Sequence, residues 1–178
     1  MRETDWAQAR PFDGTLVARP GFSVRALTGI GQTLVSGDCE AAVAAIAPGA
    51  PTIGLYQRVP EAAHALRIAR DRALIVTPAP LALDDGFRDG YCITRLDDGF
   101  AALEVEGEGA PLVLMQGCAE DLSAGSPSAA VLFAGLRVLL AGAQAGFRLH
   151  VERSGAEALL TWLDGASAKP EPQKSRLA

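Results

Sequence analysis

The feature that most constrains the fold of this 178-residue chain is an approximate internal duplication. In the first half, two short strand-like runs end at Gly37-Asp38, and an alanine-rich helix is predicted over Cys39–Ala47. Strand-like runs then return and end at Pro78-Ala79-Pro80. In the second half, strand-like runs between Tyr91 and Glu106 precede a short helix over Ala110–Met115 and three further strands. Because one order of elements occurs twice, two related halves are expected.

Local signals mark where several of these elements begin and end. Asp38 is typical of a helix N-cap, and Pro48-Gly49 predicts the end of that helix. Asp97-Asp98-Gly99 stands between two strand-like runs and predicts a β-hairpin. Ser154 and Glu157 have the spacing of a capping box ahead of a helix that ends near Leu163.

These elements predict an α+β fold of two related strand-helix-strand halves, with mostly antiparallel sheets covered on one face by helices. The halves span about 22–80 and 91–165 within a single domain, 22–165. Apolar residues make up 49% of the chain and charged residues 21%, which indicates a packed core. Residues 1–21 are expected to form an N-terminal arm, and the Pro-rich, charged residues 166–178 a flexible tail.

Composition excludes several classes of partner. The net charge is −5 and the sequence has no basic stripe, so a nucleic-acid binder is not expected. The most apolar stretch, 129–147, is interrupted by Arg137 and by glycines, which favours buried strands over a membrane span. Three cysteines without CxxC spacing, and acids near Met1 in place of a signal peptide, favour the cytoplasm.

The residues that carry chemistry form no established catalytic or metal-binding pattern. His64 and His150 stand far apart in the sequence, without cysteine or carboxylate at ligand spacing, so no metal site is predicted. Gly29-Ile30-Gly31 and Gly107-Glu108-Gly109 lack the third glycine of a phosphate-binding loop and are interpreted as tight turns. No catalytic residue is assigned.

Two charged groups leave alternatives open. Glu104 and Glu106 share one face of a strand, where paired carboxylates can act as acid and base, but an exposed polar strand face explains the same pattern. Arg67, Arg70 and Arg72 form the densest group of cations and are suited to binding a carboxylate or phosphate. A solvated sheet edge or a subunit contact is the other interpretation.

The second half also carries segments whose order and spacing resemble a known family. These segments are Ile93–Phe100, Leu103–Gly107, Leu112–Leu122, Phe147–Ser154 and Trp162-Leu163. They resemble the gamma subunit of heterotetrameric sarcosine oxidase, a relative of the folate-binding domain of glycine-cleavage aminomethyltransferases. The chain departs from the family at 95–97, where Arg95-Leu96-Asp97 stands in place of Asp-x-Ser, and at 69–74, where a Gly-Pro-Asp-Glu-Trp-Leu run is replaced.

The resemblance implies a non-catalytic gamma-type subunit, or a paralogue of one, in a folate-linked complex that oxidatively demethylates sarcosine or a related methylamine. Flavin, NAD and folate would then be bound by partner alpha and beta subunits and none by this chain; self-association is the other way to cover an apolar patch. The alternative is a stand-alone folate or small-acid binding protein of aminomethyltransferase type, in which Arg70, Arg72 and Arg95 hold a carboxylate. An enzyme that uses Glu104 and Glu106 is a third interpretation.

Overall fold

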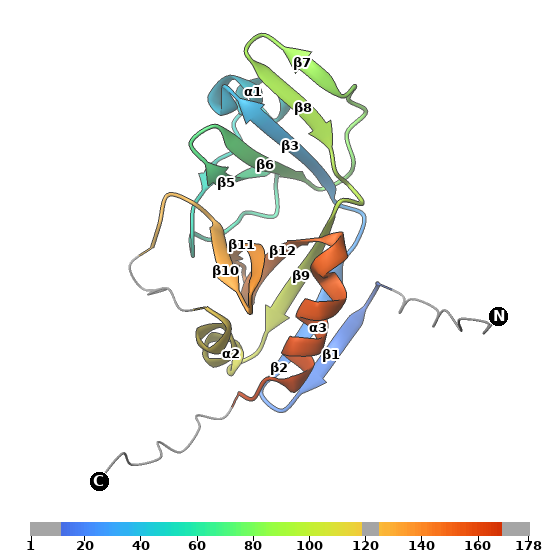
Figure 1. The fold of residues 1–178 in the computed structure, drawn as a ribbon, viewed down its shortest axis with the longest axis vertical. Coiled ribbons are helices and arrows are strands. Elements are labelled where there is room, and N and C mark those ends of the chain that lie inside the picture. Colours follow the sequence, from blue (N-terminus) through green and yellow to red (C-terminus); the bar gives the residue numbers. More distant parts are fainter. Residues whose placement is uncertain (1–11, 119–124, 169–178) are drawn as a thin grey trace, which may run out of the picture.

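The computed structural model describes residues 12–118 and 125–168, which form two six-stranded sheets and three α-helices in those ranges (Figure 1). The strands are β1 (Thr15–Arg19), β2 (Phe22–Leu27), β3 (Gly31–Gly37), β4 (Thr52–Ile53), β5 (His64–Ala69), β6 (Arg72–Thr77), β7 (Gly86–Arg88), β8 (Tyr91–Arg95), β9 (Phe100–Glu106), β10 (Ala130–Phe133), β11 (Leu136–Gly142) and β12 (Gly146–Glu152). The helices are α1 (Cys39–Ile46), α2 (Ala110–Gly117) and α3 (Ala156–Gly165), the last preceded by a 3₁₀ turn, η1 (Arg153–Gly155).

Strand order shows that the two sheets have the same plan. The first sheet runs β1-β2-β9-β12-β11-β10 and the second runs β7-β8-β3-β6-β5-β4. Within the described residues, every paired strand is antiparallel to its neighbour except β4 and β5, which are parallel. The α+β class with mostly antiparallel sheets is therefore confirmed.

The two halves exchange hairpins. β1 and β2 belong to the first half of the chain, yet β2 pairs with β9 of the second half. In the same way, the hairpin β7–β8 pairs through β8 with β3 of the first half. Each sheet is therefore built from both halves, and the sheets are linked by the two crossings β2→β3 and β8→β9.

The second crossing corrects the hairpin predicted at Asp97-Asp98-Gly99. β8 lies in the second sheet and β9 in the first, so the turn carries the chain from one sheet to the other. Asp97 Oδ1 accepts a hydrogen bond of 2.7 Å from the backbone N–H of Gln32, at the start of β3. An Asp-Gly turn reverses or redirects the chain with the same local bonds, and long-range pairing decides which strands meet.

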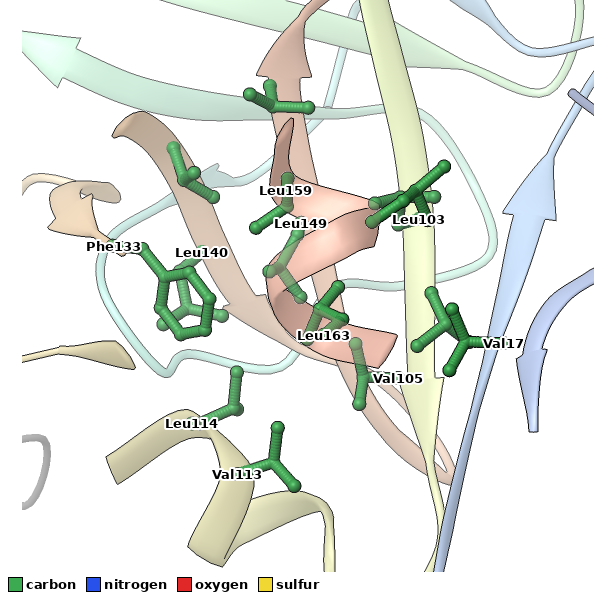
Figure 2. Close-up of a cluster of buried hydrophobic side chains, with 14 of the residues drawn as sticks. Val17, Leu103, Val105, Val113, Leu114, Phe133, Leu140, Leu149, Leu159 and Leu163 are labelled. Atoms are coloured by element: carbon green, nitrogen blue, oxygen red, sulfur yellow. The ribbon is translucent and has the colours of Figure 1, made fainter. Parts of the chain in front are cut away.

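The largest core cluster lies between the outer face of the first sheet and the helices α2 and α3 (Figure 2). Leu103 and Val105 of β9 and Leu149 of β12 point toward Leu159 and Leu163 of α3, while Phe133 and Leu140 face the region of α2 (Figure 2). A second cluster packs α1 against the outer face of the second sheet. A third, which includes Leu66, Leu74, Val76, Leu139 and Ala141, lies between the inner faces of the sheets. Helices thus cover one face of each sheet, and the remaining faces cover each other.

Other local predictions had mixed outcomes. The helix after Asp38 is confirmed, because Asp38 Oδ1 accepts the N–H of Ala41 at 3.0 Å. One was wrong: Ser154 lies in η1, so α3 begins without a side-chain cap. Residues 15–19 of the expected arm form β1, whose Leu16 and Val17 are buried, because β2 offers them a hydrogen-bonded edge.

Candidate functional site

A cleft of about 830 Å³ opens where the inner faces of the two sheets diverge. The backbone N–H of Ala129, just before β10, donates to the carbonyl of Arg67 on β5 at 2.7 Å, and the residues that follow each of them, Ala130 and Ile68, line the cleft. Leu34 and Ile68 of the second sheet and Leu139 of the first line the cleft, and all three belong to the cluster between the inner faces of the sheets. The cleft is therefore a consequence of how the sheets cross, with mostly apolar walls.

Charged side chains also line the cleft. Arg72 comes from the start of β6, Arg137 from β11 and Arg153 from η1, and the carboxylate among them is Glu152. All four side chains are exposed, and the guanidinium group of Arg153 lies 4.6 Å from the ring centroid of Phe12. No described carboxylate lies within ion-pair distance of Arg72, Arg137 or Arg153. The cleft thus combines apolar walls with a local excess of positive charge.

The three arginines proposed from the sequence to hold a carboxylate, Arg70, Arg72 and Arg95, do not lie together. Arg72 lines the cleft, whereas Arg70 lies in the exposed turn between β5 and β6 and is absent from the lining. Arg95 pairs with Asp85: its backbone N–H donates to Asp85 Oδ1 at 2.7 Å, and its Nε lies 3.7 Å from the same oxygen. Arg72 and Arg95 flank β3 on opposite sides, next to Ser36 and Thr33 respectively.

Glu104 is buried, which corrects the exposed polar face expected for Glu104 and Glu106. The register places Arg25 of β2 and Arg148 of β12 directly beside it on the neighbouring strands. Glu104 Oε2 forms an ion pair with Arg25, and Oε1 lies 3.6 Å from Arg148 Nη2. Glu106, more exposed, lies 3.6 Å from Arg25 Nη2. Neither glutamate lines the cleft, and the buried one is held between two cations.

A buried hydrogen-bond network joins the two sheets at Gln32, the first inward-facing polar residue of β3. Its side-chain N–H groups donate to the carbonyls of Asp97 and Phe100 at 3.2 and 3.0 Å. Its Oε1 therefore faces Nδ1 of His150 at 2.8 Å, and Nδ1 must carry the proton of that ring. Gln32 thus ties the β8→β9 crossing to β12.

The two histidines are both buried and approach each other from opposite sheets. Burial, the neighbouring His64 and the positive charge of Arg148 lower the pKa of His150 to about 3. Burial also lowers the pKa of His64, opposed in part by the hydrogen bond of 3.0 Å between its Nδ1 and the carbonyl of Ala62. Both rings are neutral at pH 7. Across residues 12–118 and 125–168, no group of three or more His, Cys, Asp or Glu is arranged to hold a metal ion.

The fold is similar to a solved oxidoreductase structure. A chain of heterotetrameric sarcosine oxidase from Corynebacterium sp. U-96, in complex with pyrrole 2-carboxylate, superposes with a TM-score of 0.64 over 84% of this chain and 85% of that chain. The present chain has the fold of a sarcosine oxidase subunit. Sequence identity to it is 21%. No family model and no curated protein matches the sequence. No helix within the described ranges has the length and hydropathy needed to cross a membrane.

Sequence reasoning missed most of the residues that define this region. Arg137 was considered only as an interruption of an apolar stretch, and Arg153 and Gln32 only as parts of longer segments. A glutamine at the start of an otherwise apolar strand was the available signal for Gln32, since a buried amide requires hydrogen-bond partners. The arginines of the cleft come from three separate segments, so no spacing in the sequence marks them as a group.

Proposed function

We propose that this chain is a gamma-type subunit, without a catalytic site of its own, of a sarcosine oxidase-like complex that carries out folate-linked oxidative N-demethylation. The observation that carries the proposal is the shared fold over more than four-fifths of both chains. A match over 84% of this chain and 85% of the other extends well beyond one common motif. In this role flavin, NAD and folate are bound by the partner subunits. This chain binds no cofactor and packs against those subunits.

The described surface offers apolar side chains that such partners would cover. Leu112 and Met115 lie one turn apart on α2 and are 36% and 62% exposed, and Phe87 on the edge strand β7 is 76% exposed. Exposed phenylalanine on a sheet edge favours association with another chain.

The test is affinity purification of the tagged full-length chain from its native host, with mass spectrometry of bound proteins and an absorbance scan for flavin. The proposal predicts a stoichiometric flavoprotein partner. Met115→Glu and Phe87→Glu are expected to reduce its recovery, while Arg70→Gln, on the exposed β5–β6 turn, changes the net charge by the same one unit and serves as the control. A compact monomer recovered without flavin or partner would contradict the subunit role.

A second candidate function is a stand-alone folate or small-acid binding protein. The cleft favours it, because Arg72 lies there beside apolar walls that suit an organic ligand. Calorimetry of the purified chain with a reduced folate tests this candidate directly. Absence of heat at millimolar folate would exclude folate as the ligand.

A further inference from the structure

We infer that the cleft between the two sheets binds an organic anion with an apolar body, of the class of long-chain or aryl carboxylates, through Arg72, Arg137 and Arg153. This inference deepens the second candidate function by naming the site and its ligand class. It does not depend on the subunit role, because the isolated chain carries all the residues concerned.

The sign of the ligand charge follows from the balance of side chains in the cleft. Three arginines and one acidic residue, Glu152, line it, in a chain whose net charge is −5, and the guanidinium group of Arg153 also stacks on Phe12. Arg19, Arg25 and Arg95 each form an ion pair with a nearby carboxylate, whereas the described carboxylates leave the three cleft arginines unpaired. Guanidinium groups bind carboxylates and phosphates with two parallel hydrogen bonds, so an anionic group is the complement of this rim.

The apolar part of the ligand follows from the walls. Leu34, Ile68 and Leu139 are contributed by the facing sheets, and Phe100 lies at the start of β9, where the sheets come together. The volume of about 830 Å³ lies within the range of small-molecule sites. Inorganic phosphate alone would leave these walls in contact with water, and an apolar chain or ring removes them from it.

The few hydrogen-bond acceptors that line the cleft favour an acyl or aryl ligand over a heterocycle that carries N–H donors. The side-chain acceptors that line the cleft are Glu152, Ser126 and Ser154. A ring with several N–H donors needs an acceptor for each, because an unpaired donor costs free energy when it leaves water. An acyl or aryl body has no such donors, so apolar walls with a cationic rim suit it better.

The experiment is a fluorescence titration of the full-length chain with 8-anilinonaphthalene-1-sulfonate, an apolar anion, followed by displacement with decanoate. Decyltrimethylammonium has the same alkyl chain with the opposite charge and is the ligand control. We expect decanoate to displace the dye at a concentration at least tenfold lower than the cation does, and phosphate to displace it poorly. Equal displacement by decanoate and the cation would show nonspecific apolar adsorption and overturn the inference.

Matched variants locate the site. Arg72→Gln with Arg137→Gln should weaken decanoate binding tenfold or more, whereas Arg70→Gln, two residues from Arg72 but outside the cleft, should change it less than twofold. If the double variant does not fold, each single variant is expected to weaken binding about threefold. Unchanged binding in the folded variants would overturn the inference. Binding of tetrahydrofolate without decanoate would also overturn it while supporting the second candidate function, and neither result bears on partner recovery.

Discussion

Glu104 lies between two arginines because its strand, β9, is flanked by β2 and β12 in a register that aligns Arg25, Glu104 and Arg148. Glu104→Gln removes the negative charge and leaves the largely buried Arg148 without its partner. Breaking a buried ion pair by changing one member costs about 3–5 kcal/mol, and Arg25 is half-exposed, so we expect about 2 kcal/mol less stability. Urea denaturation of the variant and the parent measures the difference.

Glu106→Gln is the matched control, because Glu106 lies two residues away on the same strand face and contacts the same Arg25 more loosely. A partly exposed ion pair contributes about 0–1 kcal/mol, so this variant should resemble the parent. Equal effects of the two substitutions would mean that Glu104 behaves as a surface residue.

The lowered pKa of His150 predicts that the folded protein loses stability in mild acid. Its pKa is about 3 in the folded protein, against about 6.5 in an unfolded chain, so between these values the unfolded state binds a proton that the folded state does not. The contribution of neutral His150 to the free energy of unfolding is therefore complete above pH 6.5. It falls by about 1.4 kcal/mol per pH unit between pH 6.5 and pH 3. His64, whose pKa is also lowered, acts in the same direction.

Urea denaturation at pH 7.5 and pH 5 measures this effect, which should be about 2 kcal/mol from His150 alone. His150→Asn keeps an N–H donor near Gln32 Oε1 but does not titrate, so the variant should lose a large part of the pH dependence. The same pH dependence in the variant and the parent would assign the effect to other groups.

At the scale of single elements, the N-termini of α1 and α3 can be compared directly. Asp38 Oδ1 caps α1, whereas Ser154 makes no cap bond to α3. We expect Asp38→Ala to lower the free energy of unfolding by about 1 kcal/mol, because a backbone N–H loses its acceptor. Ser154→Ala should change it by less than about 0.5 kcal/mol. Thermal or urea denaturation distinguishes these results. A larger loss of stability for Ser154→Ala than for Asp38→Ala would mean that Ser154, and not Asp38, caps its helix.

The same comparison shows which elements could be predicted from the sequence. α1 was predictable because its cap, its alanine-rich interior and its Pro-Gly end are all local signals. The turn at Asp97-Asp98-Gly99 was misinterpreted because its local chemistry suits a hairpin, and only pairing of β8 with β3 and of β9 with β2 reveals a crossing. Local residues specify where an element ends, whereas the partner of a strand depends on the rest of the chain.

At the scale of the whole molecule, the exchanged hairpins predict cooperative unfolding. Neither sheet retains all its central pairs if one half of the chain is lost, because β2–β9 and β3–β8 both join the halves. Native-state hydrogen exchange should therefore show the slowest amides of β3 and β9 opening with the same free energy. A lower opening free energy throughout the second sheet would indicate that the two sheets unfold independently.

The candidate site also belongs to this scale. The sequence singled out Arg72 because three cations stand close together, but it could not pair Arg72 with Arg137 and Arg153. These residues become neighbours only through the packing of two sheets whose strands are far apart in the sequence. Arg95, selected together with Arg72, is instead occupied by Asp85 of the loop before β7.

The matching strand orders have a consequence for the origin of the chain. Each half supplies one hairpin to the sheet of the other half, and the two sheets repeat the same order from edge to edge. A gene of half this length could encode the same architecture as a symmetric dimer of two copies that trade hairpins. Fusing two such genes would make the exchange internal and free each copy to diverge. In the present chain, that divergence is visible in α3, which follows β12 and has no counterpart after β6.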